Sequence, residues 1–234
     1  GTIGGGYYNS MTAGDYSTIA GGQYNAIVAV SGDGNTIGGG HKNSISADNT
    51  LLTDSSYCTI GGGSTNIAHG GNYTTIAGGQ GNTITGNSTH SIIAGGHSHV
   101  ISGSYSSIVA GGSEHGMTGN QNHRNTIIGG HQNKIDKAQY SAIVGGYGNS
   151  ISGGASNAGM FGSARSSING YNHAVMIGCD ASVADQASTV FMPGLKVTGA
   201  SVRAALGSGD GDVSVQFTNS TNLFTYHTSD ARLK

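Results

Sequence analysis

The sequence predicts an all-β chain folded as a parallel β-solenoid, and three observations carry that prediction. Glycine supplies 44 of the 234 residues, and charged residues make up only 9%. A unit of the form Ser/Thr-x-Ile-x-Gly-Gly-x-x-Asn-x-Ile recurs with a period near 16 residues. Its apolar positions do not follow the 3.6-residue period of a helix, and each glycine would cost a helix about 1 kcal/mol. A fold of stacked β repeats satisfies all three.

Composition also excludes other classes of glycine-rich protein. Collagen is excluded because the chain has one proline and no glycine at every third position. Disorder is disfavoured because Ile and Val recur in a fixed frame and the formal net charge is −2. This weak charge predicts no nucleic-acid partner, and no apolar run approaches the roughly 18 residues that insertion into a membrane requires.

Eleven copies of the repeat align on the second glycine of each pair. The steps between copies are 16 to 18 residues, with one step of 23 that leaves room for a projecting loop. The chain opens inside a repeat, so we expect it to be part of a longer protein. The aligned position holds Gly6, Gly22, Gly40, Gly63, Gly79, Gly96, Gly112, Gly130 and Gly146, and then Ser163 and Cys179 in two degenerate copies.

Each copy carries two apolar residues, which predict two short strands with one inward side chain apiece. The first lies three residues before the aligned glycine: Ile3, Ile19, Ile37, Ile60, Ile76, Ile93, Val109, Ile127 and Ile143. The second lies five residues after it, or four in the case of Ile67: Met11, Ile27, Ile45, Ile67, Ile84, Ile101, Met117, Ile135, Ile151 and Ile168.

The thinness of each coil predicts an assembly of several chains. Two or three buried side chains cannot offset the entropy of ordering one coil. Stacked coils can, because each strand pairs with the next at about 4.8 Å. Since a single solenoid still has little apolar volume, we expect three chains to pack or intertwine as a homotrimer.

A polar column follows from stacking the repeats. Asparagine recurs two residues before the second apolar position, where it tolerates a left-handed backbone and bonds its neighbours at a turn. We expect these stacked amides to form a structural ladder. The ladder comprises Asn9, Asn25, Asn43, Asn82, Asn133 and Asn149.

Aromatic residues form further columns. One follows the glycine pairs, with Tyr7, Gln23, His41, Gln80, His97, His131 and Tyr147. The other lies three residues before the first apolar position, and its members are the candidate glycan contacts Tyr16, Tyr57, Tyr73, His90 and Tyr140. Such columns can stack on sugar rings and bond their hydroxyls, or they can fill the groove between packed chains. The sequence leaves both roles open.

No metal, cofactor or disulfide is expected. His97 and His99 would share one face of a strand, but no carboxylate or cysteine cluster accompanies them. A structural metal on a trimer axis is the less favoured alternative to a ladder or surface role for the histidines. Cys58 and Cys179 would lie several coils apart, beyond the ~7 Å Cα separation that a disulfide allows. They are expected to be buried thiols.

Signs of catalysis are absent from the repeat. The sequence has no nucleophile elbow, and the glycine runs precede neither a helix pattern nor a Lys-Ser/Thr pair. A glycosidase would need two facing carboxylates, which the sequence does not predict within one chain and does not exclude between chains. The acidic residues mostly fall outside the core motif: Asp15, Asp33, Asp48, Asp54, Glu114 and Asp136.

The pattern divides the chain into three parts. Residues 1–190 form the repeat domain, and Pro193, the only proline, marks a break in the ladder. Residues 191–228 read as a connector and a C-terminal cap, in which Asp212–Phe217 alternates like a half-buried strand and Asn222–Tyr226 is a second strand of a hairpin. Residues 229–234 follow.

The last residues, Thr228-Ser229-Asp230-Ala231-Arg232-Leu233-Lys234, resemble the start of the endosialidase-type intramolecular chaperone of phage tailspikes and tail fibres. The resemblance implies a homotrimeric fibre whose chaperone assembles the trimer and then cuts itself off. It implies a cleavage junction between Thr228 and Ser229, with Ser229 as the self-cleaving nucleophile. The body of the chaperone is not in this chain, so the resemblance implies self-cleavage only where that body is present.

A second resemblance is to the heads of YadA-type trimeric autotransporter adhesins, carried by Ser141-Ala142-Ile143-Val144-Gly145 and Ala174-Val175-Met176-Ile177-Gly178. It implies a trimeric parallel β-roll on a bacterial surface. The sequence therefore favours the structural and receptor-binding part of a phage tail fibre, located in the virion tail, that binds host-surface polysaccharide or lipopolysaccharide. The alternatives are an autotransporter head and a capsular polysaccharide depolymerase.

Overall fold

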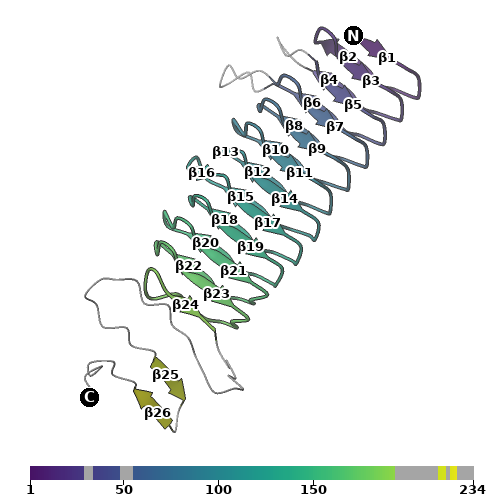
Figure 1. The fold of residues 1–234 in the computed structure, drawn as a ribbon. Coiled ribbons are helices and arrows are strands. Elements are labelled where there is room, and N and C mark those ends of the chain that lie inside the picture. Colours follow the sequence, from purple (N-terminus) through teal and green to yellow (C-terminus); the bar gives the residue numbers. More distant parts are fainter. Residues whose placement is uncertain (29–33, 48–54, 193–215, 220–221, 226–234) are drawn as a thin grey trace, which may run out of the picture. The chain divides into compact units, whose positions relative to one another are not determined.

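The computed structural model describes residues 1–28, 34–47, 55–192, 216–219 and 222–225. Every regular element in these residues is a β-strand, and the strands before residue 193 pair in parallel, coil upon coil (Figure 1). The predicted all-β parallel solenoid is confirmed. Among the described residues there is no apolar helix of the length needed to cross a bilayer.

Two long sheets run the length of the solenoid, and each coil gives one strand to each sheet. The first sheet has twelve strands and the second has ten. In the first sheet these are β1 (Thr2–Ile3), β3 (Thr18–Ile19), β5 (Thr36–Ile37), β7 (Thr59–Ile60), β9 (Thr75–Ile76), β11 (Ile92–Ile93), β14 (Ile108–Ala110), β17 (Thr126–Ile128), β19 (Ala142–Val144), β21 (Gly159–Phe161), β23 (Val175–Ile177) and β24 (Val190–Phe191). In the second they are β2 (Ser10–Ala13), β4 (Ala26–Val28), β6 (Ser44–Ser46), β8 (Ile67–His69), β10 (Thr83–Thr85), β12 (Val100–Ser102), β15 (Gly116–Thr118), β18 (Lys134–Asp136), β20 (Ser150–Ser152) and β22 (Ser167–Asn169).

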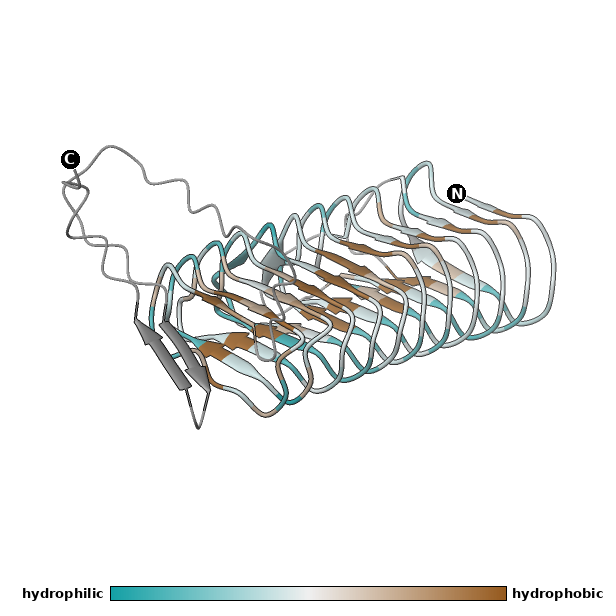
Figure 2. Ribbon diagram, turned by 60° about the horizontal axis from the view of Figure 1, so that its bottom comes forward, coloured by the Kyte–Doolittle hydropathy of each residue, from teal (hydrophilic) through white to brown (hydrophobic). Residues whose placement is uncertain are grey.

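The core is a pair of stacked columns, one from each sheet. Ile37 pairs with Ile60 in the first sheet and Ile84 pairs with Ile101 in the second, and all four are fully buried. Figure 2 shows the apolar residues concentrated on these strands. β-branched side chains suit such columns because each packs against its equivalent in the next coil.

Two of the predicted core residues are exposed: Ile3, in the first strand, at 43%, and Ile67. Ile67 is 38% exposed, and its neighbour Ala68 is the buried residue that pairs with Ile45 and Ile84. The register is held by Asn66, whose N–H donates to the Asn43 side chain at 3.0 Å. Because side chains alternate along a strand, fixing Asn66 inward turns Ile67 outward.

Once Ala68 is counted as the buried residue of its coil, one half of every coil has a constant number of residues and the other half has a variable number. Eight residues separate the buried position of the first sheet from that of the second in all ten coils, as from Ile60 to Ala68. The return path varies, from eight residues between Ala68 and Ile76 to fifteen between Ile45 and Ile60. Insertions therefore enter only at the corner between the second sheet and the next strand of the first sheet.

The opposite corner carries the glycine pairs. A Cβ on the second glycine of a pair, such as Gly22, would overlap the carbonyl oxygen of Gly40 in the next coil. Gly22 also has a φ of 89°, where side-chain-bearing residues are strained. Stacking of the coils therefore explains the second glycine of each pair.

The solenoid closes ten full coils, and an eleventh is incomplete. In place of an eleventh strand, the second sheet ends in the single bridge between Ser167 and Val183, followed by the buried Ala184. Two small sheets complete the described fold. β13 (Ser104–Tyr105) pairs with β16 (Asn122–His123) within the solenoid. In a unit separate from the solenoid, β25 (Gln216–Asn219) pairs antiparallel with β26 (Asn222–Thr225), which is the small C-terminal β region expected from the sequence.

Candidate functional site

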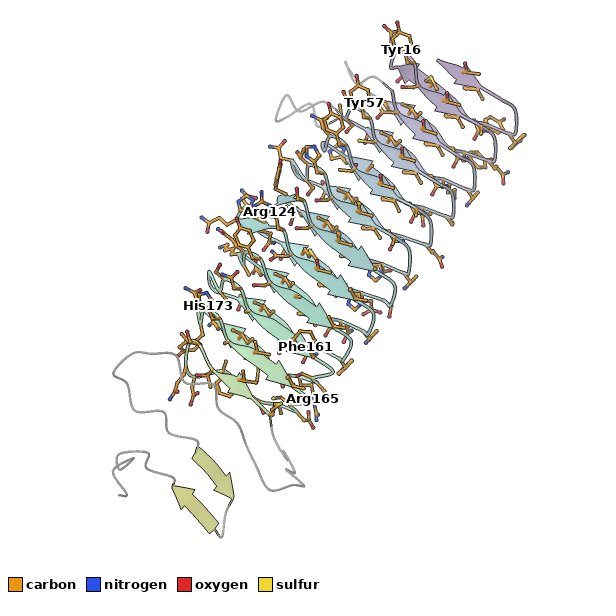
Figure 3. All side chains as sticks on the ribbon, viewed as in Figure 1. Tyr16, Tyr57, Arg124, Phe161, Arg165 and His173 are labelled. Carbon is orange, nitrogen blue, oxygen red and sulfur yellow. The ribbon has the colours of Figure 1, made fainter. Side chains whose placement is uncertain are left out.

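The candidate residues lie at the variable corner, which we call the tyrosine corner. Figure 3 shows Tyr16, Tyr57, Arg124 and His173 along this edge, with Arg165 on the opposite one. The structure thus brings all five predicted glycan contacts into one column. In successive coils that column holds Tyr16, Gly34, Tyr57, Tyr73, His90, Ser106, Arg124, Tyr140, Asn157, His173 and Ser188.

A left-handed backbone points these side chains outward. The φ angles of Tyr57, Tyr73 and His90 are 56°, 55° and 55°, in a region that few residues other than glycine adopt. Each turn is held by a hydrogen bond to the preceding coil. The N–H of Tyr73 donates to the Ser56 carbonyl at 2.9 Å, and the N–H of His90 donates to the Asn72 carbonyl at 3.0 Å. Strain of this kind persists only where the surrounding structure fixes it.

Three of these rings form a continuous stack. The ring centroids of Tyr57 and Tyr73 are 5.1 Å apart with planes 8° from parallel, and those of Tyr73 and His90 are 5.0 Å apart at 12°. These separations match the spacing of stacked strands, about 4.8 Å. The coils therefore set the spacing of the rings, and the stack presents ring edges and hydroxyl groups at regular intervals.

The stack remains open to solvent. Tyr57 is 55% exposed and Tyr73 is 52% exposed. Inside the stack the faces of the rings cover one another, so a ligand would meet their edges and the two phenol hydroxyls. At the N-terminal end the ring of Tyr57 lies over Gly34, where a Cβ would come within 2.8 Å of it. This edge suits hydrogen bonding along an extended polar ligand.

The row continues toward the C-terminus through residues that the sequence reasoning missed. Tyr105 follows His90 at 5.5 Å, and His123 follows Tyr105 at 6.2 Å. Both stand one position earlier in the repeat than the other rings, in the strands β13 and β16. The signal for Tyr105 and His123 is their equal position in the two copies, four residues before Val109 and Ile127.

A cation, Arg124, joins the row to Tyr140. The guanidinium group of Arg124 donates to the Tyr140 hydroxyl at 2.9 Å, and its Cζ lies 5.5 Å from the centroid of that ring. Arg124 was not among the predicted residues, because its column was read only for aromatic side chains. We call the row from Tyr57 through Arg124 to Tyr140 the aromatic strip.

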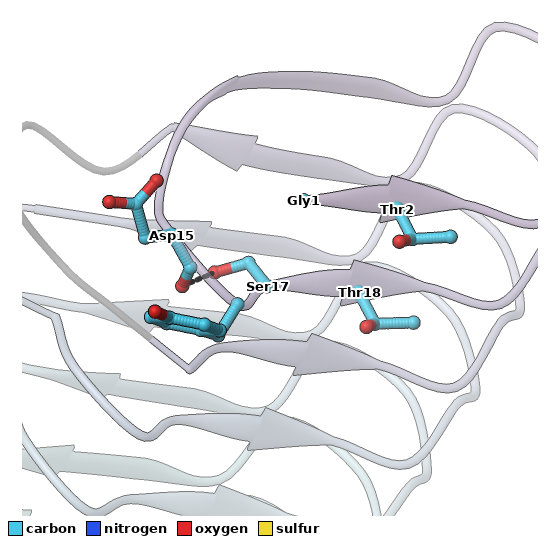
Figure 4. Close-up of a pocket in the computed structure, with 6 residues that line it drawn as sticks. Gly1, Thr2, Asp15, Ser17 and Thr18 are labelled. Carbon is cyan, nitrogen blue, oxygen red and sulfur yellow. Dashed lines mark hydrogen bonds between the residues drawn. The ribbon is translucent and has the colours of Figure 1, made fainter.

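Tyr16 stands apart from the aromatic strip. It is 88% exposed and borders a shallow hollow at the N-terminal end of the solenoid, together with Thr2, Asp15 and Ser17 (Figure 4). Stacked rings cover the faces of Tyr73, whereas no ring stacking involves Tyr16 among the described residues. Tyr16 is therefore the best placed of the candidates to stack face-on against a ligand.

The asparagines form a buried ladder beneath the glycine corner. The N–H of Asn43 donates to the Asn25 side chain at 3.0 Å, and the Asn43 amide donates to the carbonyls of Gly39 and Gly63. Asn66, which the sequence reasoning omitted, occupies the same position. Each amide thus satisfies backbone groups of two coils, which is a structural role. The predicted members Asn9, Asn25, Asn43, Asn82, Asn133 and Asn149 all lie in this column.

Two histidines replace asparagine in the ladder. His99 and His115 are buried, and their rings stack 4.9 Å apart at 2°. Each Nδ1 accepts a backbone N–H from the next coil at 3.2 Å, from His115 and Asn133 respectively. Neither Nε2 has a hydrogen-bond partner. Burial lowers the pKa of His99 and lowers that of His115 to about 4.

The expected pairing of His97 and His99 on one strand face is wrong. His97 is exposed and His99 is buried, because Ser98 between them has a φ of 56° and breaks the alternation of the strand. His131 does lie in the column of His97, two coils away. Within the described ranges no group of three His, Cys, Asp or Glu side chains has the arrangement of a metal site.

The two cysteines are free and buried, as expected. Burial raises the pKa of both thiols, which makes them poor nucleophiles. Thr228 and Ser229, the junction implied by the chaperone resemblance, lie outside the described residues. The acidic side chains of Glu114 and Asp180 bond Gln132 and Arg165 on the surface.

Aromatic residues also gather at the glycine corner. Tyr8 and Tyr24 stack at 5.4 Å, and His131 stacks on Tyr147 at 5.4 Å. Tyr147 is 48% exposed, close to the exposure of Tyr73. This short stack has the chemistry of the aromatic strip at a corner where the coil length never varies. Comparison with protein-family models and with curated proteins finds no match to this chain.

Proposed function

We propose that this chain is the structural and receptor-binding part of a phage tail fibre or tailspike, and that it binds a host-surface polysaccharide or lipopolysaccharide along the aromatic strip. The observation that carries the proposal is the exposed ring stack of Tyr57, Tyr73 and His90, spaced at one ring per coil. A rigid array of phenol and imidazole groups matches a polymer whose hydroxyls also repeat along its length.

The location of the aromatic strip supports a binding role. It lies at the corner that accepts insertions, and binding residues are commonly placed on variable loops held by a rigid scaffold. Tyr and Arg are the side chains that dominate many recognition surfaces, since they offer contact area and directed hydrogen bonds at low entropy cost. Arg124 adds a positive charge, which favours a glycan bearing acidic groups.

The tail-fibre assignment rests on the resemblance at Ser229–Lys234, and the trimeric autotransporter head is the alternative. Both imply a homotrimer and a glycan or host-surface ligand, so the aromatic strip serves either. A depolymerase would need a pair of facing carboxylates. Within the described part of the chain, Glu114 and Asp180 are instead engaged by Gln132 and Arg165.

A glycan array of bacterial capsular polysaccharides and lipopolysaccharides tests this proposal, followed by titration calorimetry with the polysaccharide that gives the strongest signal. Replacing Tyr57 and Tyr73 together by alanine removes two phenol hydroxyls and the centre of the stack. We expect binding to weaken by at least about tenfold, or about 1.4 kcal/mol. The double variant Thr83→Ala/Thr85→Ala is the matched control, because it also removes two hydroxyl groups but on the outer face of the second-sheet strand β10, away from both corners.

The outcome that contradicts the proposal is equally specific. Equal affinity of the wild-type protein and the Tyr57→Ala/Tyr73→Ala variant would show that the strip is not the binding site. Equal losses in that variant and in Thr83→Ala/Thr85→Ala would show that the loss is not specific to the strip and would contradict the proposal. A correctly folded wild-type protein with no signal on the array would remove the receptor-binding role for the glycans displayed.

A further inference from the structure

The glycine corner contains one glycine per coil that has free space for a side chain within the single chain. The first glycine of each pair recurs without exception in eleven coils, and a Cβ added to it would meet no atom within 4 Å. These glycines, which we call the glycine ridge, are Gly5, Gly21, Gly39, Gly62, Gly78, Gly95, Gly111, Gly129, Gly145, Gly162 and Gly178.

Backbone conformation explains only part of the glycine ridge. Gly5, Gly39 and Gly95 have φ angles near 145°, which favour glycine. Five others lie between 57° and 71°, yet this chain places Tyr, Lys, Arg and His at similar angles elsewhere. Gly21, Gly62 and Gly78 are not left-handed at all. At Gly21, Gly62 and Gly78, therefore, neither the backbone conformation nor a contact within the chain accounts for the absence of a side chain.

The face beside the ridge has the composition of an interface core. The outward residues of the first sheet are Thr, Ala, Gly, Val, Ile, Met and Phe, and none is charged in any strand from β1 to β24. The second sheet turns the charged residues Lys134 and Asp136 to solvent in β18 alone, and its other outward residues are largely Ser and Thr. Depletion of charge is the compositional mark of an interface core. Large apolar side chains are left exposed along this face: Ile92, Ile108, Ile128, Phe161, Ile177 and Val190.

The length of the coil gives an independent indication. The path through the glycine corner is eight residues in all ten coils, while the tyrosine corner varies. A corner that merely faced solvent would tolerate insertions as the other one does. We infer that the glycine ridge and the outer face of the first sheet form the interface between parallel copies of this chain, in which the bare ridges bring the backbones of the copies into close contact.

A second copy is the occupant that these observations fit. A partner has to match eleven contacts repeated at the coil spacing of about 4.8 Å, and a parallel copy does so because its own ridge has the same period. Parallel copies also bring Phe161 and Ile177 of each chain together, so that these apolar residues bury one another. The glycine ridge and the two outward columns of the first sheet together offer roughly 30 residues. Each side of a stable interface contributes about that number.

This inference deepens the proposed fibre by assigning the trimer contact. Light scattering of the wild-type protein is expected to give about 70 kDa, three times the 23.3 kDa of one chain. The test variant is Gly62→Leu/Gly78→Leu, since both sites have free space and an ordinary backbone within the chain. We expect the variant to keep its far-UV circular dichroism and to fall to the mass of a monomer. The matched control, Thr85→Leu, lies on the second sheet and is expected to remain a trimer.

Crosslinking tests the same contact without added bulk. Oxidation of Gly78→Cys is expected to join two chains covalently, and Thr85→Cys under the same conditions is expected to leave single chains. The inference is overturned if Gly62→Leu/Gly78→Leu keeps the wild-type mass, if Gly78→Cys crosslinks no better than Thr85→Cys, or if the wild-type protein is a monomer. A trimer that depends on the ridge but binds no glycan would leave this inference standing and remove only the receptor-binding role.

Discussion

At the scale of single residues, the unusual feature is the number of bulky side chains at left-handed backbone positions. Two corners of most coils carry such a residue, among them Lys42, Tyr73 and Arg165. Each costs about 1–2 kcal/mol relative to a relaxed backbone. Stacking and hydrogen bonding between coils hold these residues in place. Where a side chain makes no such contacts, replacing it by glycine should relieve the strain and raise the free energy of unfolding.

Lys42→Gly is the corresponding prediction. Lys42 is exposed with a φ of 55°, and its N–H donates to the Gln23 carbonyl at 2.9 Å, a bond that glycine keeps. Relief of strain outweighs the greater freedom of glycine in the unfolded chain, so we expect a gain of about 0.5–1 kcal/mol in urea denaturation. Lys134→Gly, in the regular strand β18, should instead lose about 0.5–1 kcal/mol. A loss at both sites would show that the left-handed corner stores no recoverable strain.

Residue-level features also mark the limit of what the sequence predicted. The aromatic column was visible because Tyr57, Tyr73 and Tyr140 share one position in the repeat. Tyr105 and His123 were missed because they join the row from the neighbouring position, which only the path of the corner reveals. Ile67 was misassigned because apolar character suggested the core, whereas the hydrogen bonds of Asn66 decide which neighbour points inward.

At the scale of elements, the ladder explains how strands of two or three residues hold register. The amide of Asn82 donates to Gly78 and Gly96 and accepts the N–H of His99, so one side chain ties two coils together. His99 and His115 reproduce only half of this pattern. Their Nδ1 atoms accept as the asparagine oxygens do, but their Nε2 atoms make no hydrogen bond of ordinary geometry to the nearby glycine carbonyls. The ladder is therefore weakest where the two histidines stack.

This pair predicts sensitivity to acid. In the native state the pKa of His115 is about 4, below its ordinary value of 6.5, and that of His99 is also lowered. The unfolded chain therefore takes up protons first as the pH falls below about 6.5, and stability declines until the native histidines are protonated too. For His115 the loss amounts to about 3 kcal/mol near pH 4. Thermal unfolding measured from pH 7 to pH 4 should show this decline.

The variant His99→Asn/His115→Asn should remove most of that decline. Asparagine restores the donors to the glycine carbonyls and carries no titrating group, so the variant should be more stable than the wild type at pH 5. His173→Asn is the control, since His173 is exposed and at a corner that asparagine tolerates. If the double variant and the wild type lose stability in parallel as the pH falls, carboxylates rather than these histidines govern the acid response.

At the scale of the whole molecule, the solenoid is a one-dimensional stack with two different edges. The repeat predicted the sheets and the core because every coil uses the same pattern of apolar, glycine and asparagine positions. The sequence did not reveal that the two edges differ, since this depends on which half of the coil changes length. One edge holds the aromatic strip and accepts insertions, and the other carries the glycine ridge and keeps a constant length. A fibre that joins copies along one edge and meets its ligand along the other needs that division.

Such a stack should tolerate the removal of one whole coil. Deleting Gly129–Val144 joins Ile128 to Gly145, so that β17 would run into the corner that β19 serves now. Because each coil contacts only its neighbours, we expect the same circular dichroism per residue and a body shorter by about 4.8 Å in small-angle scattering. Deleting only residues 129–136 removes β18 and half a coil. The second-sheet strands that follow, beginning with β20, would then stack on strands of the first sheet. This mismatch should unfold the neighbouring coils. Equal damage from the two deletions would mean that the coils are not interchangeable and that stability depends on specific contacts of the missing coil.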